Sequence, residues 1–306
     1  MNLKRTIRRH AKRAGDKAVG ALAIALMKVA RLFDPDKMTD FAGWLTRSIG
    51  PFFSEHKVGR DNLVVAFPEK TPGEIDEILL GVWDNLGRVG AEFAHLDRLW
   101  DLKIDAPQSS RIEVDERTRQ LFEKLRDDGK GALIFAAHTG NWELPALAGP
   151  AYGLESAVLY RRPNIEAIDH AIRDLRALNM GMLVANTLDA PLKLANALAR
   201  GSHVGMLIDQ HYGRGVEVNF FGRKALANPL LARLVNQVDV PIHGVRIIRL
   251  PNHRFRADLS EEVLPARNSD GSVDINGTMQ RVTDVIEGWI REYPDQWLWL
   301  HRRWRS

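Results

Sequence analysis

The sequence predicts an α/β fold in which helices flank a mostly parallel or mixed central sheet, preceded by a membrane-binding helix at the N-terminus. Short apolar runs bounded by turn residues alternate with segments of helical periodicity, and this alternation is typical of a sheet covered on both faces. The 306 residues, 45% of them hydrophobic, are enough for a substantial core. We find no repeat and no low-complexity linker, so we expect a single domain after the N-terminal segment.

Each predicted strand is a short apolar run, and each predicted helix repeats its apolar residues three and four positions apart. A capping box formed by Thr71 and Glu74, with Pro72 in the first turn, predicts a helix from position 71 onward. The other predicted helices span residues 115–126, 165–178, 191–199, 229–237 and 277–291. The predicted strands span residues 132–137, 156–160, 182–185, 204–208, 242–248 and 254–259.

The first residues of the chain are strongly basic. Residues 1–17 hold seven basic residues and one acidic residue, a net charge of +6, whereas the whole chain carries +4. A basic arm on a slightly acidic body indicates a polyanionic partner, either anionic lipid or nucleic acid. A nucleic-acid partner is not expected, because the charge is confined to one arm and is not interleaved with aromatic residues over a broad face.

A helical wheel of this segment favours lipid. One face gathers the apolar residues Val19, Leu22, Leu26, Val29 and Phe33, and the opposite face gathers the basic residues Arg13, Lys17, Lys28 and Arg31. A helix lying in a membrane interface is built this way, so we assign residues 1–34 to a membrane-associated segment and residues 35–306 to the catalytic domain. The apolar stretch 18–27 is shorter than the roughly 20 residues of a spanning helix. A spanning anchor and a cleavable signal peptide are the alternatives.

The clearest chemical signal is His138, which follows the apolar run 132–137 and precedes Glu143 by five residues. Ligands bind at the carboxyl ends of strands in open α/β sheets, and the turn 139–141 allows Glu143 to return toward the imidazole. Such a pair can take a proton from a hydroxyl near neutral pH. The alternative is a strand-end histidine bonded to the backbone, with Glu143 as an N-terminal helix charge.

Other chemistries have less support. His138 and Glu143 lack the second histidine of a helical zinc motif, and we expect no metal and no organic cofactor. The chain has no cysteine and no Gly-x-Ser-x-Gly elbow, so covalent catalysis is not indicated. General-base activation of an acceptor hydroxyl remains, with a donor that supplies its own activated acyl group.

Three further groups of residues are candidates for a role. Asp209 and Gln210 end the apolar run 203–208, so we expect them near His138, either positioning substrate or shaping a loop. Phe220–Gly222 could line an acyl groove or pack in the core. The C-terminal tryptophans and arginines would form a docking face for the sheet or an aromatic belt at a membrane surface: Trp297, Trp299, Trp304, Arg302 and Arg303. The alternation of Trp297, Trp299 and His301 favours a strand.

The segment His138–Glu143 resembles the H-x(4)-D/E motif of glycerolipid acyltransferases, in the glutamate form typical of the lipid A biosynthesis lauroyl/myristoyl acyltransferases. Four further blocks resemble that family in the same order: Tyr160–Asn164, Gly205–Gln210, Val218–Gly222 and Gln296–Trp304. The resemblance runs from about residue 41 to the C-terminus and is strongest from Gly131 onward.

The resemblance implies that His138 is the general base and that Glu143 orients and charges the imidazole. It implies transfer of an acyl chain from an acyl carrier protein thioester to a hydroxyl of a lipid A precursor, at the cytoplasmic face of the inner membrane. Arg161 would anchor an acceptor phosphate, although Arg162 follows it at once and could take that role.

Two alternatives to this reading stay open. One is an acyltransferase for another glycolipid, such as a phosphatidylinositol mannoside. The other is a non-catalytic, peripheral lipid-binding protein, for which His138 and Glu143 would be dispensable.

Overall fold

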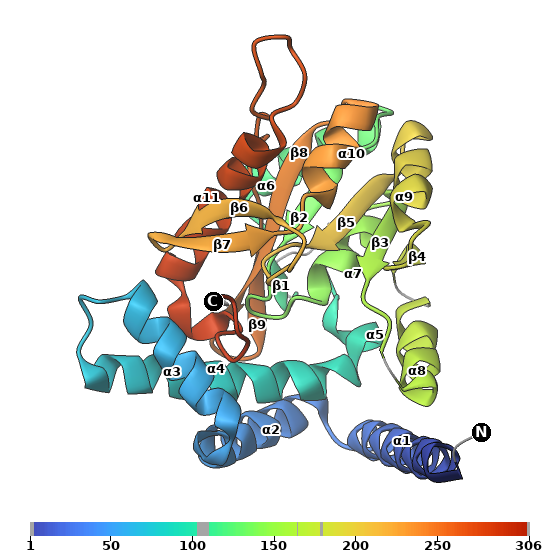
Figure 1. Cartoon of the computed structure of the whole chain (residues 1–306), viewed down its shortest axis with the longest axis vertical. Coiled ribbons are helices and arrows are strands. Elements are labelled where there is room, and N and C mark those ends of the chain that lie inside the picture. Colours follow the sequence, from blue (N-terminus) through green and yellow to red (C-terminus); the bar gives the residue numbers. More distant parts are fainter. Residues whose placement is uncertain (1–2, 103–109, 164, 178–179, 305–306) are drawn as a thin grey trace.

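The computed structural model describes residues 3–102, 110–163, 165–177 and 180–304, with the side chains of these residues except 3–14, 16, 166 and 177. A seven-stranded sheet in the order β1-β9-β8-β2-β5-β3-β4 forms its centre (Figure 1). β8 and β9 pair antiparallel, and the other neighbouring pairs are parallel. The prediction of a mixed, mostly parallel sheet flanked by helices is therefore confirmed.

The six strands predicted from apolar runs lie close to their predicted positions, and three further strands among the described residues, at 112–113, 216–220 and 223–227, were not predicted. The large sheet contains β1 (Ile112–Glu113), β2 (Leu133–Ala136), β3 (Ser156–Tyr160), β4 (Met182–Ala185), β5 (His203–Leu207), β8 (Ile242–Leu250) and β9 (Arg254–Leu259). A separate hairpin pairs β6 (Val216–Phe220) with β7 (Arg223–Ala227). Its turn residues Phe221 and Gly222 both have positive φ, 53° and 70°, as the tight turn of a two-residue hairpin requires.

Each predicted helix is present, and four further helices in the described part of the chain, at residues 35–49, 54–66, 96–99 and 144–151, were not predicted. The helices are α1 (Leu3–Ala30), α2 (Pro35–Ile49), α3 (Ser54–Ala66), α4 (Pro72–Phe93), α5 (Leu96–Leu99), α6 (Glu116–Asp127), α7 (Leu144–Ala151), α8 (Glu166–Ala177), α9 (Ala190–Ala199), α10 (Leu230–Val238) and α11 (Ile275–Glu292). Short 3₁₀ turns span Gly50–Phe52 and Pro294–Gln296. The capping box of Thr71 and Glu74 is present at the start of α4.

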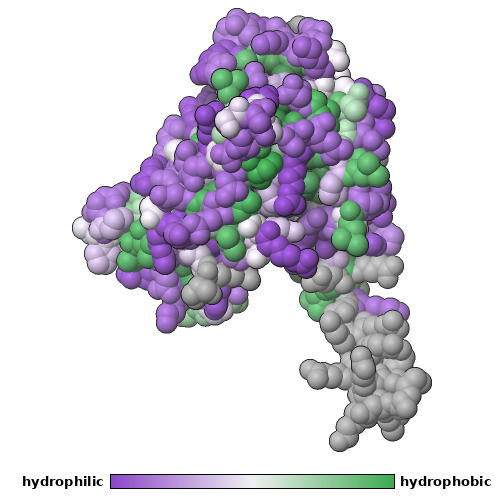
Figure 2. Space-filling view, turned by 45° about the horizontal axis from the view of Figure 1, so that its top comes forward, coloured by the Kyte–Doolittle hydropathy of each residue, from purple (hydrophilic) through white to green (hydrophobic). Residues whose placement is uncertain are grey.

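The two faces of the sheet are packed differently. On one face, Leu133, Phe135 and Val204 join the main core with apolar residues of α9, α10 and α11. On the other face, Ala136 and Val245 pack with residues of α6 and α7 in a smaller cluster. In the view of Figure 2, hydrophilic residues cover most of the surface and hydrophobic ones gather in a few groups.

α4 lies along the edge at which the parallel strands end, and α2 packs against α4 on the outer side (Figure 1). Ion pairs attach α2 to the start of β1 and to α4. Asp36 pairs with Arg111 next to β1, and Asp40 pairs with Arg88 of α4 at 2.7 Å. The helical layer therefore lies at the end of the sheet where ligands of such folds usually bind.

The N-terminal helix α1 is present, and its predicted apolar face is exposed. The side chains on that face, Val19, Leu22, Leu26, Val29 and Phe33, are each at least 50% exposed. Lys17 and Lys28 are exposed as well, and the side chain of Arg13 lies outside the described residues. None of the helices in the described part of the chain is long and apolar enough to cross a membrane.

α1 contacts the body of the protein near Gly20 and Arg31. Gly20 is buried, and a Cβ there would lie 3.0 Å from the Cβ of Ala167 in α8. Arg31, which we grouped with the basic membrane-facing residues, instead pairs with Asp97 at 2.9 Å and donates to the Ala94 carbonyl at 2.6 Å. Arg31 thus fixes the end of α1 against α5.

The strand predicted at Trp297, Trp299 and His301 is wrong. The segment is irregular and shares only an isolated bridge, between Trp297 and Thr139, with the residues that follow β2. Both tryptophans are 0% exposed and belong to the main core. They form no aromatic belt at a membrane, and their alternation reflects packing between neighbouring aromatic side chains rather than pleating.

Candidate active site

His138 lies just after β2, on the turn that leads to α7. Gly140 in this turn has a positive φ of 54°, and a Cβ there would lie 2.1 Å from the carbonyl oxygen of Ile247. Glycine alone satisfies both conditions, because it has no Cβ and adopts positive φ at little cost. The sharp turn predicted after the strand is therefore confirmed.

Asp209 holds the imidazole of His138 in one orientation. Its Oδ1 lies 2.8 Å from His138 Nδ1, and its Oδ2 accepts the His138 backbone N–H at 2.9 Å and the Trp297 indole N–H at 2.7 Å. Because an ionised carboxylate only accepts, the imidazole proton lies on Nδ1. Nε2 therefore presents its lone pair at the open side, where the Gln210 side-chain nitrogen lies 3.3 Å away.

His138 and Asp209 each shift the pKa of the other. Burial disfavours the charged imidazole, but the Asp209 carboxylate outweighs it and the pKa of His138 is raised. Burial also disfavours the charged form of Asp209, yet His138 and the backbone hydrogen bond lower the pKa of this carboxyl well below its usual range. Asp209 is thus ionised, and His138 is a stronger base than a free imidazole.

Glu143 occupies a different place from the one we expected. It occupies the N-cap position of α7 without a side-chain capping hydrogen bond, and its carboxylate pairs with Arg176 of α8 at 2.6 and 3.0 Å. The carboxylate in contact with the imidazole is Asp209, and Glu143 raises the pKa of His138 only through its charge at longer range. The contact with the imidazole that we expected of Glu143 is therefore made by Asp209.

Basic residues lie around the opening beside His138. Arg176, paired with Glu143, has its guanidinium 5.5 Å from the centre of the Phe93 ring. Arg161 is exposed and lines the opening, whereas Arg162 pairs with the buried carboxylate of Asp169 at 2.8 Å. Of the two arginines after Tyr160, Arg161 is the one next to the cavity.

A cavity of about 550 Å³ begins at His138 and extends beneath the sheet. Residues of β2, β3 and β5 form most of one wall, and residues of α6 and α7 form the other. The lining includes alternate residues of these three strands, and β8 and β9 each add one residue: Ile134, Ala136, Ser156, Val158, Tyr160, His203, Gly205 and Leu207, with Val245 and Leu259. The cavity follows the chain of β5 from His203 to the level of Asp209. Six residues of a parallel strand span about 20 Å, which gives the length of the cavity. Ala136 and Gly205 have small side chains, which leaves space between the two walls of the cavity.

Several site features did not follow from the sequence analysis. Arg176 stands in a helix with other charged residues, and no local signal separates it from them. Trp297 was expected at a docking face for the sheet or in a membrane belt, and its hydrogen bond to Asp209 was not expected. Phe220 and Phe221 are 1% and 5% exposed in the core, so core packing, the second of our two readings, is confirmed.

Among the described residues, no group of three or more His, Cys, Asp or Glu side chains is placed to hold a metal ion.

Comparison with known proteins decides the family. Residues 6–306 match the model of the family described as bacterial lipid A biosynthesis acyltransferase. The chain belongs to this family. It is 22% identical over 274 residues to the lipid A biosynthesis palmitoleoyltransferase of Escherichia coli (strain K12), covering 84% of this chain and 81% of that protein. The same figures hold for the lipid A biosynthesis acyltransferase of Shigella flexneri. The family resemblance of the sequence motifs is confirmed, and the protein is an acyltransferase of this family.

Proposed function

We propose that the protein transfers a fatty acyl chain from an acyl carrier protein thioester to a hydroxyl of a lipid A precursor, with His138 as the general base. The observation that carries the proposal is the pairing of His138 Nδ1 with the buried Asp209, which turns Nε2 toward a largely apolar cavity. The base and a site suited to an acyl chain thus meet at one point.

The proposed step needs no covalent intermediate on the protein. The acceptor oxygen attacks the thioester carbonyl carbon while His138 Nε2 takes the hydroxyl proton, and the charge that builds on the imidazole is stabilised by Asp209. The tetrahedral intermediate collapses with cleavage of the carbon–sulfur bond, and the sulfur leaves with the proton from Nε2. Gln210, 3.3 Å from Nε2, donates a hydrogen bond to an oxygen of the reacting centre.

Arg161 binds a phosphate of the acceptor in this proposal. Its side chain is exposed at the opening of the cavity, and a guanidinium grips phosphate oxygens in a bidentate way. Glu143 neutralises Arg176 through two hydrogen bonds, so Arg176 shapes the opening and contributes less free charge. Lipid A precursors, which are phosphorylated glycolipids, fit such an arrangement.

The cavity accommodates the donor acyl chain, and Gly205 controls its depth. A Cβ at Gly205 would meet only the Val158 side chain, at 3.9 Å, so a larger side chain would fit and would fill the cavity. We expect Gly205→Leu to reduce kcat/KM for the longest accepted donor by at least about tenfold, because one methylene in an apolar pocket is worth that much. Short donors should be spared. Transfer rates for a series of thioesters of increasing length measure the effect.

The matched control for Gly205 is Gly288→Leu, at an exposed position of α11 where a Cβ meets nothing within 4 Å. This control should leave the chain-length profile unchanged. An identical profile for Gly205→Leu and the wild type would place the acyl chain elsewhere.

We also propose that the protein works at the cytoplasmic face of the inner membrane, with α1 lying in the interface. The exposed apolar face of α1 and the +6 charge of residues 1–17 support an anionic bilayer as the partner. Phe41 and Trp44 of α2 are 51% and 61% exposed. α2 lies at the same end of the molecule as α1, the end at which the parallel strands finish (Figure 1). The acceptor lipid would thus enter directly beside His138.

Loss of the apolar face should release the protein from membranes. We expect Leu22→Asp combined with Leu26→Asp to weaken binding to vesicles containing anionic lipid by at least about 100-fold, because burying each leucine contributes about 1.5–3 kcal/mol. Flotation with such vesicles measures the bound fraction. Leu264→Asp, at a position 63% exposed and far from α1 in the chain, is the control and should bind normally. Equal binding of all three proteins would contradict a membrane role for α1.

The substrate assignment is tested by the mass of the acceptor. Purified protein is incubated with an acyl carrier protein thioester, or with the coenzyme A thioester of the same acid, and a tetra-acylated lipid A precursor in mixed micelles. A gain of one acyl chain with the carrier-protein donor supports the proposal. Thioester consumption without acceptor modification would overturn the choice of acceptor and make mannosides the next to test. No turnover with retained lipid binding would favour a non-catalytic protein.

A further inference from the structure

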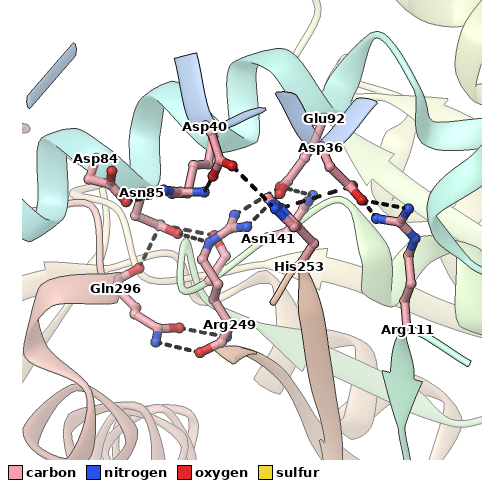
Figure 3. A network of polar contacts seen from close by, with 12 residues as sticks. Asp36, Asp40, Asp84, Asn85, Glu92, Arg111, Asn141, Arg249, His253 and Gln296 are labelled. Carbon is pink, nitrogen blue, oxygen red and sulfur yellow. Dashed lines mark hydrogen bonds and ion pairs between the residues drawn. The ribbon is translucent and has the colours of Figure 1, made fainter. Parts of the chain in front are cut away.

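The turn that carries His138 is held from outside the cavity by polar residues of α4, β8 and the segment before Trp297 (Figure 3). Asn85 donates its side-chain N–H to the Gly140 carbonyl at 3.0 Å, and the Gly140 N–H donates to the Gln296 carbonyl at 3.0 Å. Asn141, which is 0% exposed, donates to Glu92 Oε2 at 2.8 Å. Both residues that follow Thr139 are thereby fixed.

An ion pair between Glu92 and Arg249 forms the centre of this group. Arg249 donates to both carboxylate oxygens of Glu92, at 2.8 Å to Oε2, and its Nε donates to Asn85 Oδ1 at 2.9 Å. Glu92 is 3% exposed and Asn85 is 5% exposed. A buried ion pair is weak evidence for stability, because desolvation of the two charges offsets their attraction. The position of the Glu92–Arg249 ion pair next to the turn is better explained if the pair holds the turn in place.

The same group reaches both members of the His138–Asp209 pair. The Gln296 side chain bonds the backbone N–H and carbonyl of Arg249, at 2.8 and 3.0 Å. The two residues that follow Gln296 touch the site: the Trp297 indole donates to Asp209, and the Leu298 N–H donates to the His138 carbonyl at 3.0 Å. A displacement of Gln296 would therefore change the distance between His138 and Asp209.

We propose that Asn85, Glu92 and Arg249 are positioning residues that hold the His138 turn in register with Asp209. None of the three is among the described residues that line the cavity, so they act through Gly140, Asn141 and Gln296. The inference rests on the proposed function for its effect on catalysis, but the geometry it concerns exists without substrate. Misplacement of a catalytic group by about 1 Å costs up to about 100-fold in rate.

The test compares Glu92→Gln and Asn85→Ala with the wild type and with Asp258→Asn. The control carboxylate pairs with Arg246, also on β8, at 3.0 Å, and the two side chains are 13% and 23% exposed. We expect the two network variants to lose roughly 10- to 100-fold in kcat per folded molecule with KM little changed. The control should keep its kcat even if its melting temperature falls.

A second readout does not depend on turnover. The pKa of His138 is followed by NMR titration, with its signal assigned through His138→Ala. In Glu92→Gln and Asn85→Ala the pKa of His138 should fall toward that of a free imidazole, because its contact with Asp209 loosens. An unchanged pKa of His138 in both folded variants would overturn the positioning role, whatever the substrate proves to be. If only one of the two variants folds, the pKa of His138 in that variant decides the positioning role.

Discussion

His138→Ala should abolish acyl transfer while leaving the fold intact. Removing a general base costs about 10²–10⁴-fold in rate. The imidazole is the group whose Nε2 faces the cavity opening. The rate is measured with the carrier-protein thioester and the lipid A precursor at saturating concentrations.

The folded state should survive because Asp209 keeps other donors. The backbone N–H of residue 138 remains, and so does the Trp297 indole, at 2.9 and 2.7 Å from Asp209 Oδ2. Circular dichroism and the melting temperature check this. His170→Ala, at an exposed position of α8, is the matched histidine control and should retain full activity. A folded His138→Ala that keeps more than about a tenth of the activity would rule out His138 as the base.

The sequence was most informative where one local pattern determines one element. Short apolar runs became β2, β3, β5 and β8 almost residue for residue, and the capping box of Thr71 and Glu74 begins α4. α2 was not predicted, because its pattern is reversed. Small residues, Thr39 and Gly43, form its buried side, whereas Phe41 and Trp44 are exposed. Hydrophobic periodicity locates a buried face only when the large apolar residues are the buried ones.

The active site could be predicted only in part, because some of its contacts depend on tertiary structure and not on a local sequence pattern. The apolar runs placed His138, Asp209 and Gln210 at one sheet edge, because parallel strands end together, and the register of β2 with β5 brings residues 138 and 209 side by side. Which carboxylate contacts the imidazole depends on the turn after β2. That turn leads directly into α7 with Glu143 at its cap, a tertiary detail with no sequence signal.

Asp209→Asn should reduce kcat on the order of 10²–10⁴-fold, and Glu143→Gln should reduce it much less. An asparagine can donate as well as accept, so it no longer fixes the imidazole proton on Nδ1, and it cannot stabilise the imidazolium that forms during attack. Glu143 acts on His138 only through its charge. Comparing the two variants at saturating substrate distinguishes the carboxylate in contact with the base from the one in the family motif. Equal losses in both would contradict this distinction.

The pH dependence gives an independent check on the same pair. Activity requires the neutral imidazole, so it rises with pH through the pKa of His138, which Asp209 holds above its ordinary value. In Asp209→Asn the burial of His138 remains and the opposing charge is gone, so the pKa of His138 should fall and the rising limb should move to lower pH. The deficit of the variant is therefore largest at high pH and shrinks as the pH falls, since the wild-type base becomes protonated first. Profiles of kcat/KM against pH give the midpoint of this rising limb. If the midpoint is the same in Asp209→Asn and the wild type, the titrating group is not His138 paired with Asp209.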